Sequence, residues 1–222
     1  MAKVFNDPTY SAVARSILIA SGAALGLYVI RFAITGGVMF GFMAWNLVLS
    51  LLALLAAVVC FVSAKAKQNK QAVIAACIWL LLLPNTFYML TDFIHVYDSG
   101  DITVMFDIVM VGLFAMNGFL HGLLSIYLMH KLLLKRVSAL RAAAGVGLVI
   151  LLASFAVDMG RYLRWNSWDI LLHPVALLGD VANTILHPLA YDRSFVVTAV
   201  FFVAISSLYA VFWQLSQVQY KK

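Results

Sequence analysis

A short polar stretch, PNTFYMLTDFIH at residues 84–95, follows directly on an apolar run and carries side chains capable of acid–base chemistry. If the helix of that run continues at about 100° per residue, Asn85, Tyr88, Asp92 and His95 fall within an arc of roughly 80°. Ionisable side chains in a membrane helix are costly, and they usually face the bundle interior or a water-filled cavity. The stretch therefore predicts a polar face that points into the protein.

Further ionisable groups follow in the segments 105–130 and 142–169. Because a helix rises about 1.5 Å per residue, counting inward from the expected outer ends puts many of these groups at the depth of Asp92. The sequence therefore predicts an outward-facing polar pocket. Its expected catalytic residues are Asp92, His95 and Asp107. Its expected substrate-binding residues are Asn85, Tyr88, Asp158, Arg161, Arg164, Trp165, Asn166 and Asp169.

The residue types allow more than one chemistry. Asp92 could orient His95 as a general base, and Asp107 could join them around a divalent metal. The D-x-x-H spacing does not decide between these roles, so no metal site is assigned and the cofactor stays unknown. Arg161 and Arg164 suit a phosphate or carboxylate, because a guanidinium group matches the geometry of such anions.

Two structural alternatives stand beside the pocket. Asp158 and Arg161 are three residues apart on one helix and could form an internal ion pair. Asn85 and Asn117 are expected at similar depth and could hydrogen-bond to each other, which would only hold two helices together.

The composition defines the elements that must position these groups. The chain has 222 residues, of which 64% are hydrophobic and 11% charged, with a mean hydropathy of +1.00. These values predict an all-α polytopic membrane protein that forms a single transmembrane domain over residues 1–222. Six apolar segments are long enough to span a bilayer, at about 11–33, 39–64, 72–95, 105–130, 142–163 and 194–218.

Basic residues indicate the orientation of these spans. With six spans both termini lie on one side, and that side carries eleven basic residues against four on the other. The eleven are Lys3, Arg15, Lys65, Lys67, Lys70, Lys131, Lys135, Arg136, Arg141, Lys221 and Lys222, and the four are Arg31, Arg161, Arg164 and Arg193. The positive-inside rule then predicts cytoplasmic termini. The net charge of +6 follows this topological pattern, so no nucleic-acid partner is predicted.

The segment 165–193 contains apolar runs that are too short to span a bilayer. We expect short helices here that lie in the outer interface before the last span. Arg15 and Arg31, near the ends of the first span, are expected to extend toward the membrane surface.

The motifs PNxxYxxTDxxH at 84–95 and GRxxRWNSWD at 160–169 resemble those of a bacterial family of integral membrane proteins of unknown function. The resemblance extends from about Trp45 to the last span. It implies a small multi-pass membrane protein and supplies no substrate, cofactor or mechanism. The expected location is the bacterial cytoplasmic (inner) membrane, with both termini cytoplasmic.

Three functions remain open. The first is an outer-leaflet enzyme that acts on a lipid-linked or phosphate-bearing envelope substrate, with the lipid bilayer and an anionic or lipid-linked ligand as partners. The second is a small-molecule or proton-coupled transporter, in which the stripe from Asp107 through Asn117 and His121 to Ser125 would form a wet path. The third is a non-catalytic assembly protein, in which the polar groups only fix helix packing.

Overall fold

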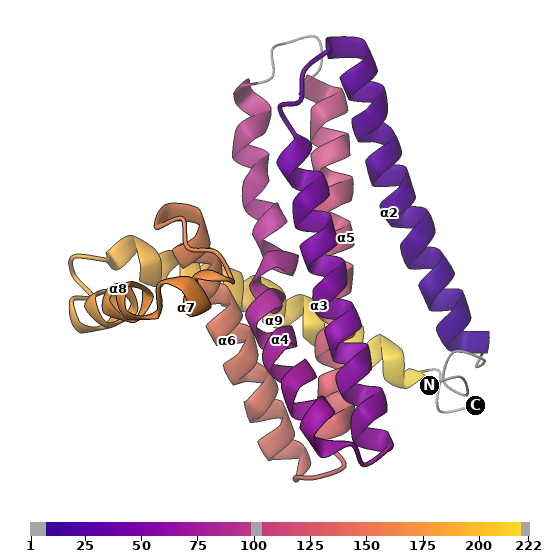
Figure 1. The fold of residues 1–222 in the computed structure, drawn as a ribbon, viewed down its shortest axis with the longest axis vertical. Helices are drawn as coiled ribbons and strands as arrows, with labels where there is room; N and C mark the ends of the chain where they lie inside the picture. The colour runs from indigo at the N-terminus through magenta and orange to yellow at the C-terminus, as the bar shows by residue number, and fades with distance from the viewer. Residues whose placement is uncertain (1–7, 99–103, 219–222) are drawn as a thin grey trace. The chain divides into compact units, whose positions relative to one another are not determined.

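The computed structural model describes residues 8–98 and 104–218, and the described residues form helices and their connections without a strand (Figure 1). Six helices are long and apolar enough to cross a membrane: Ser11–Thr35, Gly41–Lys65, Asn69–Val96, Val104–Leu133, Ala139–Tyr162 and Asp192–Val218. The prediction of an all-α polytopic membrane protein with six spans is therefore confirmed. Lys3, Lys221 and Lys222 of the basic count lie outside the described residues.

The chain divides into two compact units, Met1–Leu128 and Met129–Lys222, with the boundary inside one helix. Unit 1 contains α2 (Pro8–Thr35), α3 (Gly41–Lys65), α4 (Asn69–Tyr88), η1 (Met89–Asp98) and most of α5 (Val104–Leu133). Unit 2 contains the end of α5, α6 (Ala139–Tyr162), α7 (Asp169–Leu172), α8 (Pro174–Leu186) and α9 (Asp192–Val218). A single transmembrane domain over 1–222 stays a prediction.

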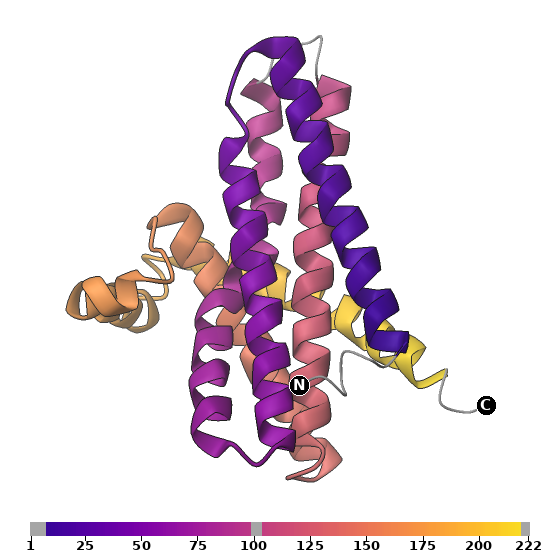
Figure 2. The same ribbon diagram turned by 45° about the vertical axis from the view of Figure 1, so that its right-hand side comes forward.

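In unit 1, α2, α3, the continuous α4–η1 segment and α5 run side by side, each in the direction opposite to the one before it (Figures 1 and 2). The helices α3 and α4 pack together along their lengths. One end of the unit has an apolar core that includes Phe40, Met43, Met89, Met110 and Phe114. Apolar side chains from α3, η1 and α5 therefore meet at the level of the polar stretch.

The helices α4 and α5 approach closely at Gly118 and Gly122. A Cβ atom added at Gly118 would lie 2.5 Å from the carbonyl oxygen of Thr86, and one at Gly122 would lie 2.6 Å from the ring of Phe87. Small residues four apart let membrane helices come this close. The Gly-x-x-x-Gly spacing at 118–122 is visible in the sequence, but the close approach of these helices was not predicted from it.

The polar stretch is not one continuous α-helix, so this prediction is wrong. The α-helix ends at Tyr88, and η1 is a 3₁₀-helix. The side chains of Asn85, Thr86 and Thr91 each donate to the carbonyl oxygen three residues earlier, at 3.1, 2.7 and 2.7 Å. Such local bonds compete with the regular helical ladder and accompany the tighter helix after Tyr88.

In unit 2, α6 packs against α9, and α7 packs against α8. The helices α7 and α8 occupy the segment between the fifth and last spans where short helices were predicted. At 13 residues, α8 measures about 20 Å and is too short to span a bilayer of about 30 Å.

Candidate functional site

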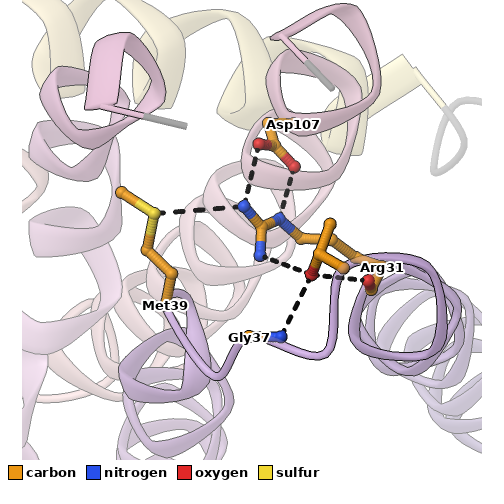
Figure 3. Close-up of polar contacts among 5 residues, drawn as sticks. Arg31, Gly37, Met39 and Asp107 are labelled. Atoms are coloured by element: carbon orange, nitrogen blue, oxygen red, sulfur yellow. Dashed lines mark hydrogen bonds and ion pairs between the residues drawn. The ribbon is translucent and has the colours of Figure 1, made fainter. Parts of the chain in front are cut away.

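The predicted catalytic residue Asp107 forms a buried ion pair with Arg31 (Figure 3). The Arg31 Nε and Nη2 atoms donate to the Asp107 Oδ1 and Oδ2 atoms at 2.7 and 3.2 Å. The side chains are 4% and 0% exposed. Asp107 also lies in the first turn of α5, where the helix dipole favours a negative charge. Arg31 was expected to extend toward the membrane surface, and this expectation is wrong.

The turn after α2 holds the guanidinium group of Arg31 in place. Gly36 has a φ of +66°, a conformation that a residue without a Cβ atom adopts without strain. The Thr35 hydroxyl donates to the Arg31 carbonyl oxygen at 3.0 Å and accepts bonds from the Arg31 Nη1 atom and the Gly37 amide (Figure 3). The Arg31 guanidinium group also lies 4.5 Å from the centre of the Phe40 ring. The cation is therefore surrounded by groups that stabilise it.

Asp92 and His95 lie three residues apart on η1. A 3₁₀-helix has three residues per turn, so the two side chains project from the same side of the helix, one turn apart. Asp92 is fully buried and His95 is partly buried. The His95 ring also meets the Phe42 ring edge to face, at 5.3 Å between centroids. The acid–base role of this pair stays a prediction.

The other predicted members in unit 1, Asn85 and Tyr88, are partly buried at the end of α4. The predicted hydrogen bond between Asn85 and Asn117 is wrong. Asn117 instead accepts a bond from the Ser21 hydroxyl at 3.3 Å and donates to the Ala20 carbonyl oxygen at 3.3 Å. Asn117 therefore joins α5 to α2.

Farther along α5, the polar residues bond to other neighbouring helices. The Ser50 hydroxyl donates to the Leu47 carbonyl oxygen at 2.8 Å and lies 2.9 Å from the His121 Nδ1 atom. The Ser50 hydroxyl and the His121 ring are therefore hydrogen-bonded, with the donor set by the histidine tautomer. Ser125 accepts a bond from the Trp79 indole at 3.0 Å. These side chains link α5 to α3 and α4.

Asp158, predicted to bind substrate, is fully buried on α6 in unit 2. Neither of its carboxylate oxygens has a hydrogen-bond partner among residues 8–98 and 104–218. The hydrogen-bonded Asp158–Arg161 pair that the sequence allowed is therefore not formed. Arg161 lies partly buried in the last turn of the same helix.

The motif after α6 forms a compact turn. Arg164 is exposed and has a φ of +59°, and the amides of Leu163 and Trp165 both donate to the Met159 carbonyl oxygen at 3.2 Å. The Asn166 amide donates to Asp169 Oδ2 at 2.7 Å, and the Asn166 side chain does so at 3.3 Å. This turn presents Arg164 at its surface.

Two contacts of this region were not predicted. The Trp165 indole donates to Asp180 Oδ2 of α8 at 2.9 Å, and the Arg193 guanidinium group lies 3.8 Å from the centre of the Tyr162 ring. Neither is visible from spacing, because each joins residues far apart in the chain. The predicted site residues thus divide into a unit 1 set and a unit 2 set, and their convergence in one pocket stays a prediction.

A metal centre would need several ligands together. Among the described residues, no three His, Cys or Asp side chains are grouped closely enough to hold a metal ion.

A family model matches residues 45–211, which is most of the chain. Comparison with curated proteins and with solved structures returns no match. The matched region begins at Trp45 and includes both sequence motifs, so the resemblance inferred from those motifs is confirmed. The chain belongs to the family described as "Protein of unknown function (DUF1361)".

Proposed function

We propose that this integral membrane protein is an enzyme that binds a lipid-linked or phosphate-bearing substrate at the outer face of the bacterial cytoplasmic membrane. Both termini would then lie in the cytoplasm, as the distribution of basic residues predicts. Anion binding would be carried by the arginines around the end of α6.

The supporting observation concerns the three carboxylates of unit 2 that follow Arg164 in the chain; the fourth, Asp158, is buried and has no hydrogen-bond partner among the described residues. Asp169 accepts bonds from Asn166, Asp180 accepts one from an indole, and Asp192 accepts one from the Arg193 backbone amide. Among the described residues, neither Arg164 nor Arg193 forms an ion pair with a carboxylate. Their guanidinium donors therefore suit an anionic ligand, for which arginine is the preferred side chain.

The catalytic part of the proposal concerns unit 1. Asp107 is neutralised by Arg31, so Asp92 and His95 are the better candidates for acid–base chemistry. Their spacing on η1 lets the carboxylate orient the imidazole, which would then act as a general base.

The transporter alternative has less support. The stripe along α5 would have to line a wet path, but Asn117, His121 and Ser125 are buried and hydrogen-bonded to neighbouring helices. Such contacts are typical of polar residues that hold membrane helices together. For this part of the chain they support a packing role, as the assembly alternative requires.

The test is lipid retention by the purified protein. Phosphatidic acid serves as the phosphate-bearing probe and phosphatidylcholine as the zwitterionic reference, and native mass spectrometry measures how much of each stays bound. Loss of one charge-assisted hydrogen bond, worth about 1.5 kcal/mol, should lower phosphatidic acid retention about tenfold in Arg164→Gln.

The matched control is Arg141→Gln, because Arg141 is also exposed and lies near the opposite end of α6. It should leave retention unchanged. Equal retention by wild type and Arg164→Gln would show that this arginine does not bind the anionic lipid, which contradicts the proposal.

A further inference from the structure

The helix α8 exposes large apolar side chains along one side. Val175, Leu178, Ile185 and Leu186 are 84%, 63%, 56% and 71% exposed. At about 100° per residue these four residues lie within an arc of roughly 100° along one face of the helix. We call this face the α8 apolar stripe.

Two polar residues of α8, Asp180 and Thr184, lie on the opposite face, whereas Asn183 is exposed beside the stripe. Thr184 is fully buried and donates to the Asp180 carbonyl oxygen at 2.8 Å, while the Asp180 side chain accepts the Trp165 indole bond. A helix at a protein–water surface has the reverse arrangement, with its apolar face toward the core. The distribution on α8 is the one expected where lipid replaces water.

The segments on either side of α8 in the chain also expose apolar side chains. Leu171 and Leu172 of α7 are 78% and 64% exposed, and Leu189 after α8 is 95% exposed. Monomeric soluble proteins rarely leave a contiguous apolar surface of this kind uncovered. An occupant is therefore required.

We propose that α8 lies in the membrane surface with its apolar stripe in the hydrocarbon layer, and that the ligand at Arg164 is consequently a lipid-linked anion. The bilayer is favoured as the occupant because α8 connects the fifth and last spans, yet is too short to be a span itself. Exposed Arg164, Trp168 and Arg193 flank it. Cationic and indole side chains at this position match the headgroup region.

The lipid-linked character of the ligand rests on the proposed function. The Trp165–Asp180 hydrogen bond of 2.9 Å ties α8 to the residue next to Arg164. An interfacial helix sits about 5–10 Å into the boundary between headgroups and acyl chains. Insertion of α8 would therefore hold the Arg164 turn at the level of the lipid phosphates. A lipid-linked anion that diffuses within the membrane could then reach Arg164 directly.

Probe depth tests the insertion without any ligand. One variant carries a single cysteine at Leu178, on the stripe, and a second carries one at Asn183, which is exposed outside the stripe. Each cysteine is labelled with an environment-sensitive nitrobenzoxadiazole probe, and the protein is placed in phosphatidylglycerol–phosphatidylcholine liposomes. The background is Cys60→Ala with Cys77→Ser, which removes both cysteines of the chain. The label at Leu178 should emit at shorter wavelength and be quenched by nitroxides on the acyl chains, whereas the label at Asn183 should be quenched by aqueous iodide.

Two outcomes would overturn the insertion. Iodide quenching at Leu178 equal to that at Asn183 would place the stripe in water. Protection of Leu178 from both quenchers, with disulfide formation between copies at Leu178, would mean that a second copy covers the stripe.

The ligand class is tested separately, by competition for the phosphatidic acid bound in wild type. Inorganic phosphate is the soluble competitor and a second phosphatidic acid species is the membrane-anchored one. Displacement only by the lipid supports a lipid-linked ligand. Equal displacement by inorganic phosphate would overturn that step, while the depth of α8 and the role of Arg164 in binding would be unaffected.

Discussion

The buried ion pair between Arg31 and Asp107 should be among the most destabilising places to remove a charge in this protein. Asp107→Asn leaves the Arg31 cation in a site where its side chain is only 4% exposed. Arg31→Gln leaves the Asp107 carboxylate at 0% exposure. An uncompensated charge in such a site costs far more than the pair itself contributes, because neither water nor a counter-ion replaces the lost partner.

The geometry sets the expected size of the effect. Two nitrogen–oxygen contacts of 2.7 and 3.2 Å make the pair bidentate, so each single substitution removes a complete charge-assisted contact. Removing one member of a buried pair typically costs about 3–5 kcal/mol. For a chain of this length, that corresponds to a melting temperature lower by about 6–20 °C. The double variant Arg31→Gln with Asp107→Asn leaves no buried charge and should recover part of this loss.

Thermal unfolding in detergent, followed by circular dichroism, measures the four proteins of this double-mutant cycle. Arg15→Gln is the control on α2, because Arg15 is exposed and contacts only the Ser11 carbonyl oxygen of its own helix, at 3.4 Å. The control should change stability by less than about 0.5 kcal/mol. The reasoning is refuted if Asp107→Asn costs no more than Arg15→Gln, or if the double variant loses the full sum of both single effects.

Two further predictions concern packing and topology. Gly118→Ala should lower the free energy of unfolding by about 1–3 kcal/mol, because its Cβ atom would meet the backbone of Thr86 at 2.5 Å. The control Gly26→Ala meets nothing within 4 Å and should be neutral or stabilising. Equal melting curves for the two variants would contradict the close approach of the helices. In the cysteine-free background, an impermeant thiol reagent should label a cysteine at Asn166 in intact cells, whereas a cysteine at Lys67 should be labelled only after lysis. Labelling of the Lys67 site from outside would overturn the cytoplasmic assignment of the termini.

The six spans could be predicted from the sequence because their signal is local. A run of about 20 apolar residues must cross the bilayer as a helix, whatever its neighbours are. The short helices before α9 were predictable for the same reason, since α8 has only 13 residues. The 3₁₀ segment was not, because it is set by side-chain bonds to individual carbonyl groups, such as Thr91 to Tyr88 at 2.7 Å. A periodicity argument does not contain those bonds.

The hydrogen-bond partners of the predicted site residues could be predicted from the sequence only where they are local. The Asn166–Asp169 contact joins residues three apart and belongs to the local turn. The partner of Asp107 lies 76 positions away on α2, in a segment outside the matched family region. An arginine near the end of a span fits both a buried pair and an extension toward the surface, and only the position of α5 distinguishes them. The unpredicted pair gives Asp107 a structural partner, and its catalytic role stays a prediction.

Polar residues in membrane helices serve either as packing contacts or as a site, and their partners distinguish the two cases. On α5, Asp107, Asn117 and His121 bond to α2 or α3, and these contacts are what a helix bundle needs to fix its register. In unit 2 the exposed Arg164 has no ion-pair partner among the described residues, although the turn beside it contains a carboxylate. A charge that packing does not use is the better indicator of function. The search for a ligand should therefore begin at Arg164, and the buried acidic residues should be tested second.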